Sequence, residues 1–297
     1  MKIQVEESSG EVSVNSVNRI AIIDQMILEQ PDLRDLLELR KMILQAQKSI
    51  RETSTKGTTI NWDDQSIIEG FKRKAQTSKM PLISSISTST FDVDKLLQMC
   101  EQIVNVLIKK EVGKEELIMF IGELKCGKLK LSELIDAAIR EDADFYEKLN
   151  GRFGVKASLL LFIVDMLIQP CLEEIAKKTG SSFLNEWRKS SCPVCGRRPV
   201  VAWIKEHKRY LACTLCGAEY LADLFLCVNC GNIDPPTLRF LTPNNYPAFR
   251  VDFCDKCKHY VKVIYKDRIR TPIPKGLEDI MTVNLDFIAE KVGLIRV

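Results

Sequence analysis

The sequence predicts an α+β protein in which an N-terminal all-helical bundle precedes two small β modules and a C-terminal helix. Apolar residues recur at helical spacing from about residue 18 to about residue 185. Four Cys-x-x-Cys pairs then follow between Cys192 and Cys257, among short β-branched and aromatic runs that favour hairpins. A helical period returns in LEDIMTVNLDFIAEKVGL. We therefore expect four segments: a helical domain 1–187, two four-cysteine modules 188–226 and 227–270, and a tail with a helix 271–297.

Within the helical half, prolines and capping residues predict where helices begin and end. Pro31 is expected to divide residues 18–50 into two helices, and Asn61 is expected to cap the next one. Residues 77–90 are rich in Ser and Thr and predict an extended connector. Residues 157–172 are strongly apolar, but they fall short of the roughly 20 apolar residues that span a bilayer. This segment predicts a buried core helix, and no membrane insertion is expected.

Composition narrows the classes of function. The chain has 297 residues, of which 45% are hydrophobic and 28% charged, and a net charge of +3 gives no global attraction to nucleic acid or lipid. The N-terminal stretch lacks the apolar region of a secretory signal, so a cytoplasmic location is expected. The helical half has no Gly-rich phosphate loop, paired histidine motif or Ser-His constellation. The sequence predicts a protein that is not an enzyme.

The cysteines point to metal rather than to disulfides. Their number, 11, is odd, and eight of them form the four pairs. The three single residues Cys100, Cys126 and Cys171 are expected to be small buried hydrophobes. A thioredoxin-type dithiol uses one pair at the start of a helix, whereas these pairs lie in predicted hairpins. Metal binding is the favoured chemistry.

A site closed by four thiolates needs two turns, each of which directs two sulfur atoms at one ion. The x-x spacing provides this geometry, and a residue that tolerates positive φ is expected after the second cysteine. Gly196, Gly217 and Gly231 occupy that place in three pairs, and Lys258 occupies it in the fourth. Four thiolates suit zinc and iron equally, so a structural zinc ribbon and a rubredoxin-like iron site both stay open.

The gaps between the pairs predict which cysteines share an ion. Gaps of 17 residues after Cys195 and 23 after Cys230 each suit two strands and a turn, whereas only 10 residues separate Cys216 from Cys227. An interleaved arrangement would also satisfy the chemistry, but sequential grouping is favoured. The predicted ligand sets are Cys192, Cys195, Cys213 and Cys216 for one ion, and Cys227, Cys230, Cys254 and Cys257 for the other.

Ribbons with four cysteines often bind nucleic acid, so the local charge matters. Residues 188–270 contain 15 Lys and Arg against 7 Asp and Glu, and two divalent ions with their thiolates would leave a bias of about +4. The basic run KEHKR at 205–209 is expected at a solvated hairpin tip. His207 and His259 lack the spacing of ligands. Nucleic acid is therefore not the expected partner, although a zinc-ribbon nucleic-acid-binding protein stays an alternative.

The order of these features resembles the formate dehydrogenase accessory proteins of the FdhE type. The likeness lies in a helical N-terminal half followed by CPVCG, RYLACTLCGAEY, CVNC and CDKC, with Tyr260 and Lys262 shortly after and a final LDFIAEKVG helix. KMPLI at 79–83 and IQPCL at 168–172 also resemble signatures of that family. The resemblance covers most of the chain and is sharpest over 192–262.

The resemblance implies a cytoplasmic, non-enzymatic maturation factor. Members of this family assist a molybdenum- or tungsten-containing formate dehydrogenase by binding its catalytic subunit, and their cysteine pairs form two rubredoxin-like sites associated with iron. The eight paired cysteines would then be the ligands of two ions, iron or zinc. A related molybdenum or tungsten oxidoreductase as client, and an iron electron carrier as function, are the alternatives. The sequence leaves open the native metal, the redox or structural role of the sites, and the oligomeric state.

Overall fold

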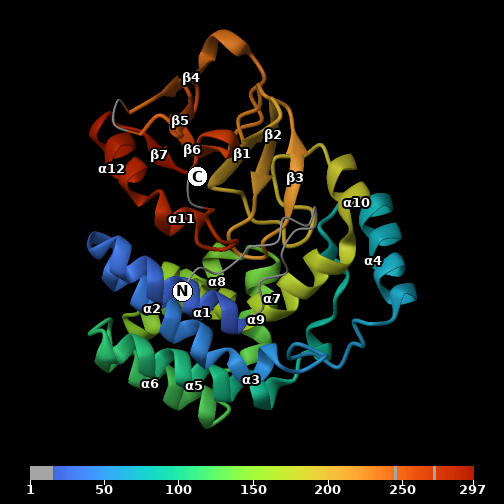
Figure 1. The fold of residues 1–297 in the computed structure, drawn as a ribbon. Helices are drawn as coiled ribbons and strands as arrows, with labels where there is room; N and C mark the ends of the chain where they lie inside the picture. Colours follow the sequence, from blue (N-terminus) through green and yellow to red (C-terminus); the bar gives the residue numbers. More distant parts are fainter. Residues whose placement is uncertain (1–15, 244–245, 270–271) are drawn as a thin grey trace, which may run out of the picture.

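The computed structural model describes residues 16–243, 246–269 and 272–297 and confirms the predicted α+β class. Figure 1 shows the helices of the N-terminal half on one side of the molecule and a twisted sheet on the other, with the last helices beside the sheet. The main hydrophobic core runs through both halves without a break, from α2 to β6. The cysteine-rich half is therefore packed onto the helical half along a shared core.

From residue 16 onward, the described part of the N-terminal half forms the α-helices α1 (Ser16–Glu29), α2 (Arg34–Ala46), α3 (Lys48–Arg51), α4 (Gln65–Ser78), α5 (Val93–Lys109), α6 (Lys114–Lys125), α7 (Leu131–Ile139), α8 (Ala143–Phe153), α9 (Ala157–Thr179) and α10 (Ser181–Glu186). Pro31 begins a short 3-10 helix, Pro31–Leu33, that separates α1 from α2 as predicted. The prediction that Asn61 caps the next helix is wrong. Asp64 is the cap, because its side chain accepts a hydrogen bond from the backbone N–H of Ser66.

The predicted connector at 77–90 is only partly extended. The first residues belong to the end of α4, and two 3-10 helices follow, η2 (Leu82–Ser85) and η3 (Thr88–Thr90). Ser and Thr side chains account for the second, because the Ser87 hydroxyl accepts from the backbone of Ser89 and caps the turn. The buried residues Leu82 and Ile83 attach the segment to the core.

Helix α9 is the predicted core helix, and it continues through Pro170. A proline within a helix leaves the carbonyl four residues earlier without its N–H partner. Here that carbonyl belongs to Met166, and it accepts a hydrogen bond of 2.6 Å from Nε2 of the buried Gln47, which lies between α2 and α3. A side chain from a distant part of the chain thus replaces the lost backbone bond, so α9 does not end at the proline.

The strands of both cysteine modules form one sheet. Its strands are β1 (Val201–Lys205), β2 (Lys208–Ala212), β3 (Glu219–Ala222), β4 (Leu238–Leu241), β5 (Phe249–Cys254), β6 (His259–Tyr265) and β7 (Ile295–Arg296). The order is β3-β2-β1-β6-β5-β4, with β7 on β6. β1 and β6 pair in parallel, Trp203 opposite Ile264, and this pairing fuses two antiparallel three-stranded units. The segment boundaries 187/188, 226/227 and 270/271 stay predictions.

The predicted C-terminal helix divides into α11 (Glu278–Met281) and α12 (Val283–Lys291) at Thr282. The Thr282 hydroxyl donates to the carbonyl of Glu278 at 2.7 Å. Leu277, just before α11, packs into the cluster between α1 and α2, whereas Leu285 and Ala289 of α12 pack on β5 and β6. The end of the chain therefore returns to the bundle and then covers the sheet.

A buried charge cluster attaches this C-terminal segment to the sheet. The side chain of Lys262 on β6 is fully buried, and its Nζ lies 2.6 Å from a carboxylate oxygen of Asp279 and 2.8 Å from one of Asp286. The hydroxyl of Tyr260 donates to the other oxygen of Asp286 at 2.7 Å. Separating a buried cation from two carboxylates has a large free-energy cost, so this contact keeps α11 and α12 in place.

The three cysteines outside the pairs differ in their exposure. Cys100 and Cys171 are buried as predicted, but the prediction for Cys126 is wrong, because it is exposed at the end of α6.

Over the residues that the structure describes, no single helix is long and apolar enough to cross a membrane. Only α8 and α9 taken together have the length and composition of a span, and they are bent by 114° relative to one another.

Candidate metal centres

The eight paired cysteines gather into two groups, and the grouping is the sequential one. The first site is Cys192, Cys195, Cys213 and Cys216; the second site is Cys227, Cys230, Cys254 and Cys257. Within each site all four sulfur atoms lie within 4.8 Å of one another, a geometry that could hold a metal ion. The interleaved alternative is thereby excluded.

The distances between sulfur atoms fit four ligands around one ion. In the first site, Cys192 and Cys216 lie 3.5 Å apart and Cys195 and Cys213 3.4 Å apart. In the second site the corresponding sulfur distances are 3.5 and 3.8 Å. With zinc–sulfur bonds of about 2.3 Å, the corners of a tetrahedron lie about 3.8 Å apart. A disulfide would need about 2.05 Å, so the spacing fits the tetrahedral donor set.

The turns that carry the sulfur atoms have the backbone predicted for them. Gly196, Gly217 and Gly231 each donate their N–H to the carbonyl of the first cysteine of the pair, at 2.8 to 3.0 Å. Lys258 does the same to Cys254 at 2.8 Å and has a φ of 61°, although it is not glycine. The four turns are therefore alike, and the lysine adopts the left-handed conformation that glycine provides elsewhere.

One thiol in each site has a lowered pKa. Hydrogen bonds from the neighbouring thiols, Cys192 first, hold the pKa of Cys213 well below its ordinary value. Burial opposes ionisation of Cys254, but the backbone N–H of Cys257 and the side-chain amide of Asn232 lower its pKa to about 7. Nδ2 of Asn232 lies 3.5 Å from the Cys254 sulfur. Both sites can supply thiolate, the form of cysteine that binds metal.

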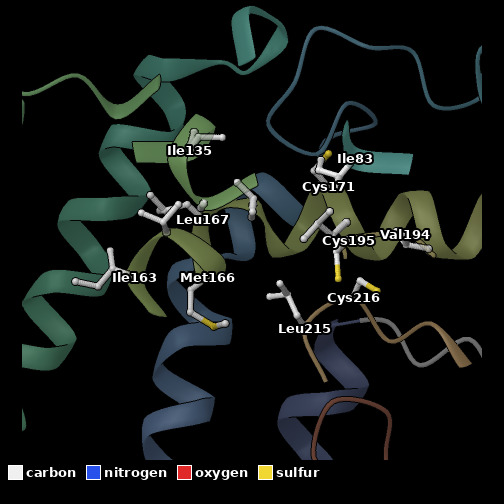
Figure 2. Close-up of a cluster of buried hydrophobic side chains, with 14 of the residues drawn as sticks. Ile83, Ile135, Ile163, Met166, Leu167, Cys171, Val194, Cys195, Leu215 and Cys216 are labelled. Carbon is white, nitrogen blue, oxygen red and sulfur yellow. The ribbon is translucent and has the colours of Figure 1, made fainter. Parts of the chain in front are cut away.

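The first site is buried between the sheet and the helical half. Its cysteines are 0 to 9% exposed, and they belong to the main hydrophobic core. Figure 2 shows the sulfur atoms of Cys195 and Cys216 facing one another beside α9, with Leu215 close by. The site is therefore enclosed by protein.

The motif KMPLI holds the first turn of this site. The backbone N–H of Leu82 donates to the carbonyl of Pro193, and that of Ile83 donates to Val194, both at 2.9 Å. Val194 and Ile83 belong to the same hydrophobic core. A Cβ added at Gly196 would come within 3.1 Å of Pro81. This segment of the helical half is fitted against the CPVCG turn.

The motif IQPCL holds the second turn. Nε2 of Gln169 on α9 donates to the carbonyl of Leu215, between Cys213 and Cys216, at 2.9 Å. Oε1 of Gln169 in turn accepts from Arg40 at 3.0 Å and from Gln47 at 3.2 Å. A buried polar network thus runs from α2 through α9 to the first site.

A charged pair adds a third connection between α9 and this site. Nη2 of Arg197, two residues after Cys195, lies 2.6 Å from Oδ1 of Asp165. Burial raises the pKa of Asp165, and Arg197 opposes that rise. The first site is consequently held by side chains and backbone of α2, α9 and the 81–83 segment.

The second site lies at the surface of the sheet. Cys227 and Cys254 are buried, but Cys230 is exposed and Cys257 is half-buried. Asn232 supports the site, since it also donates to the Thr237 hydroxyl at 2.7 Å. Sequence reasoning did not find this residue, although its place directly after CVNCG is a usable signal. Val228, in the first turn of this site, is buried and belongs to the main hydrophobic core, so the second site is attached to that core through one turn.

The remaining predicted features lie outside the two sites. His207 is exposed in the two-residue turn between β1 and β2, as predicted for KEHKR. Nδ1 of His259 donates to the carbonyl of Cys257 at 2.7 Å, so this histidine supports a turn rather than offering a ligand. Arg209 is buried and donates to the carbonyl of Leu226 at 2.8 Å. Part of the excess of basic residues in this region therefore makes internal contacts and is not available to a partner.

Comparisons with known proteins agree with this arrangement. Residues 191–222, which carry the first site and β1 to β3, match the family described as "FdhE, central domain". The chain is 27% identical over 290 residues to "Protein FdhE homolog" of Aquifex aeolicus, covering 95% of this chain and 92% of that protein. The Haemophilus ducreyi homolog is 30% identical over 111 residues, 36% of this chain and 35% of that protein.

A solved structure extends the likeness to the fold. The FdhE protein from Pseudomonas aeruginosa has a TM-score of 0.61 to this chain with 18% identity, covering 95% of this chain and 93% of that one. The chain is thus similar to FdhE proteins in sequence over almost its whole length, and it shares their fold. The resemblance predicted from the sequence is confirmed. The geometry also gives a physical reason for two of the motifs that carried the resemblance, because KMPLI and IQPCL contact the two turns of the first site.

Proposed function

We propose that this protein is a non-enzymatic accessory factor that assists maturation of a molybdenum- or tungsten-containing formate dehydrogenase by binding its catalytic subunit. The observation that carries the proposal is the near full-length likeness to FdhE proteins, which includes both the helical half and the sheet. The proposed place of action is the cytoplasm. A related molybdenum or tungsten oxidoreductase is the alternative client.

The same proposal assigns one metal ion, iron or zinc, to each four-cysteine site. Support comes from the sulfur spacing and from the four similar turns that carry the sulfur atoms. An ion bound by four thiolates supplies cross-linking between two turns, and its binding free energy contributes to folding. The chain itself positions the ligands: the turns direct the sulfur atoms, Gln169 donates a hydrogen bond to a turn of the first site, and Asn232 donates one to a sulfur atom of the second.

Affinity purification from the native host tests the client. The tagged full-length protein should recover the catalytic subunit of a formate dehydrogenase, and deletion of its gene should lower formate dehydrogenase activity while the amount of that subunit stays unchanged. A matched bait, Lys208→Glu at the exposed hairpin tip, should recover the same subunit. Recovery of ribosomal or transcription components alone would contradict the proposal and favour a nucleic-acid-binding ribbon.

A further inference from the structure

We propose that the second cysteine site exchanges its metal ion with incoming thiols and chelators, whereas the first site retains its ion. This inference rests on the proposed metal binding by both sites. It assigns different chemistry to two sites that share the same cysteine spacing. Three features of the second site favour exchange: the exposure of its cysteines, the support of its turns, and the space beside it.

Exposure distinguishes the two sites first. Metal exchange among thiolate ligands requires that a new donor atom reach the ion before the old ligand has fully left. In the first site no cysteine is more than 9% exposed, and the helical half covers the turns. In the second site Cys230 is exposed and Cys257 is half-buried, and they belong to different turns. An incoming donor can approach the second ion between these two residues.

The support of the turns differs as well. The CDKC turn is held from outside by an ion pair of 3.4 Å between Lys256 and Asp234, whose side chains are 54% and 48% exposed. A second pair, of 2.7 Å, joins Asp255 to Arg239, which is 65% exposed. Exposed pairs of this kind contribute about 0–1 kcal/mol. The turn also has a backbone hydrogen bond of 2.8 Å from Asp255 to Thr237 and the contact of His259 with the Cys257 carbonyl. All of these partners lie in the sheet region, so local opening of this turn breaks no contact with the residues that hold the first site.

A cavity gives room for the incoming ligand. It has a volume of about 310 Å³, and Cys227 and Cys254 are among its lining residues. Its lining also includes Leu224, Phe225 and Phe240, which are 52%, 52% and 60% exposed. The two buried cysteines of the second site thus face a space that a small thiol or an aromatic chelator can enter.

The chemistry is ligand substitution without electron transfer. An incoming thiolate sulfur or chelator nitrogen donates an electron pair to the ion, and the Cys230 sulfur leaves with the pair of its own bond as a thiolate. A second substitution at Cys257 then frees half of the coordination sphere. The oxidation states of the metal and of sulfur stay unchanged, and the reverse sequence loads the site.

Metal release from the full-length protein tests this inference. The protein is loaded with zinc, its zinc content is measured, and release to 4-(2-pyridylazo)resorcinol is followed by absorbance. We expect two phases of one ion each, with rates at least about tenfold apart, because a difference of about 1.4 kcal/mol in local opening free energy suffices for that factor. Cys230→Ser should abolish the fast phase, and Cys195→Ser should abolish the slow one.

The outcomes separate the inference from the function on which it rests. A zinc content below two ions per chain contradicts the proposed metal binding. Two bound ions that leave in a single phase, or a fast phase that survives Cys230→Ser, overturn the exchange proposal while the metal assignment stands.

Alkylation by N-ethylmaleimide with mass mapping provides a second measurement. The zinc-loaded protein should react first at Cys126, which is exposed and belongs to neither site, and next at Cys230 and Cys257. Cys100 should stay protected, because it is fully buried and burial raises the pKa of its thiol to about 12. Modification of Cys195 or Cys213 before Cys257 would overturn the proposal.

Discussion

The two cysteine sites have the same ligands and the same turns, and they differ in what surrounds them. The first site lies under α9 and is held by Gln169, Arg197 and the 81–83 segment. The second site lies on the outer part of the sheet and is supported by Asn232 and by exposed ion pairs. The comparison teaches that spacing determines where a metal can bind, while packing determines whether that metal is part of the core.

The largest difference is expected when each site loses two ligands. Structural zinc sites contribute about 10–16 kcal/mol in small peptides, comparable with the whole stability of a domain, about 5–15 kcal/mol. Cys192→Ser with Cys195→Ser should therefore abolish cooperative unfolding of the helical half. Cys227→Ser with Cys230→Ser should leave that transition in place. Thermal unfolding followed by far-UV circular dichroism measures both effects. An equal effect of the two double variants would contradict the conclusion that only the first site is part of the core.

An intermediate effect is expected for the link between α9 and the first site. Gln169→Leu removes the donor to Leu215 and the oxygen that accepts from Arg40, whereas Gln47 keeps its hydrogen bond to Met166. Buried groups left unsatisfied cost about 1–3 kcal/mol each, so we expect a total loss of about 2–4 kcal/mol. Denaturant titration measures this free energy of unfolding. Gln45→Leu on the exposed face of α2 is the matched control and should change it by less than about 0.5 kcal/mol.

The smallest effect is expected at the second site. Asn232→Ala removes the side-chain donor to the Cys254 sulfur. Loss of a residue that supports metal ligands typically lowers metal affinity about 10–100-fold, and the exposure of this site favours the lower value. Competition with a chelator measures the affinity. Asn229→Ala, which keeps its backbone N–H, serves as control, and a weakened first site in the Asn232 variant would contradict the independence of the two sites.

The sequence was sufficient to predict which four cysteines lie together in each group, because cysteine spacing and turn geometry are local. The conformation at Lys258 follows the same local rule as the glycines that it replaces. The division of the N-terminal region at Pro31 was also predictable, since proline restricts the backbone wherever it occurs.

The unequal burial of the sites was not predictable, because it depends on contacts between distant segments. The backbone of Leu82 donates a hydrogen bond to Pro193, more than a hundred residues later in the chain, and neither segment alone indicates this contact. The joining of the two modules into one sheet was not predicted for the same reason. β1 and β6 pair in parallel, and parallel strands are not connected by a short hairpin turn that the sequence could reveal. The helix predicted over 157–172 includes Pro170, but the sequence did not indicate that the distant Gln47 supplies the hydrogen bond that the proline lacks.

The parallel pairing of β1 with β6 also has a consequence for synthesis on the ribosome. The helices and all four cysteines of the first site leave the exit tunnel before β6, so this site can close early. Until residue 265 emerges, however, β1 presents an unpaired edge on which another nascent chain could add a strand. We expect the interval between completion of the helical half and arrival of β6 to be the stage at which this protein is most prone to aggregate.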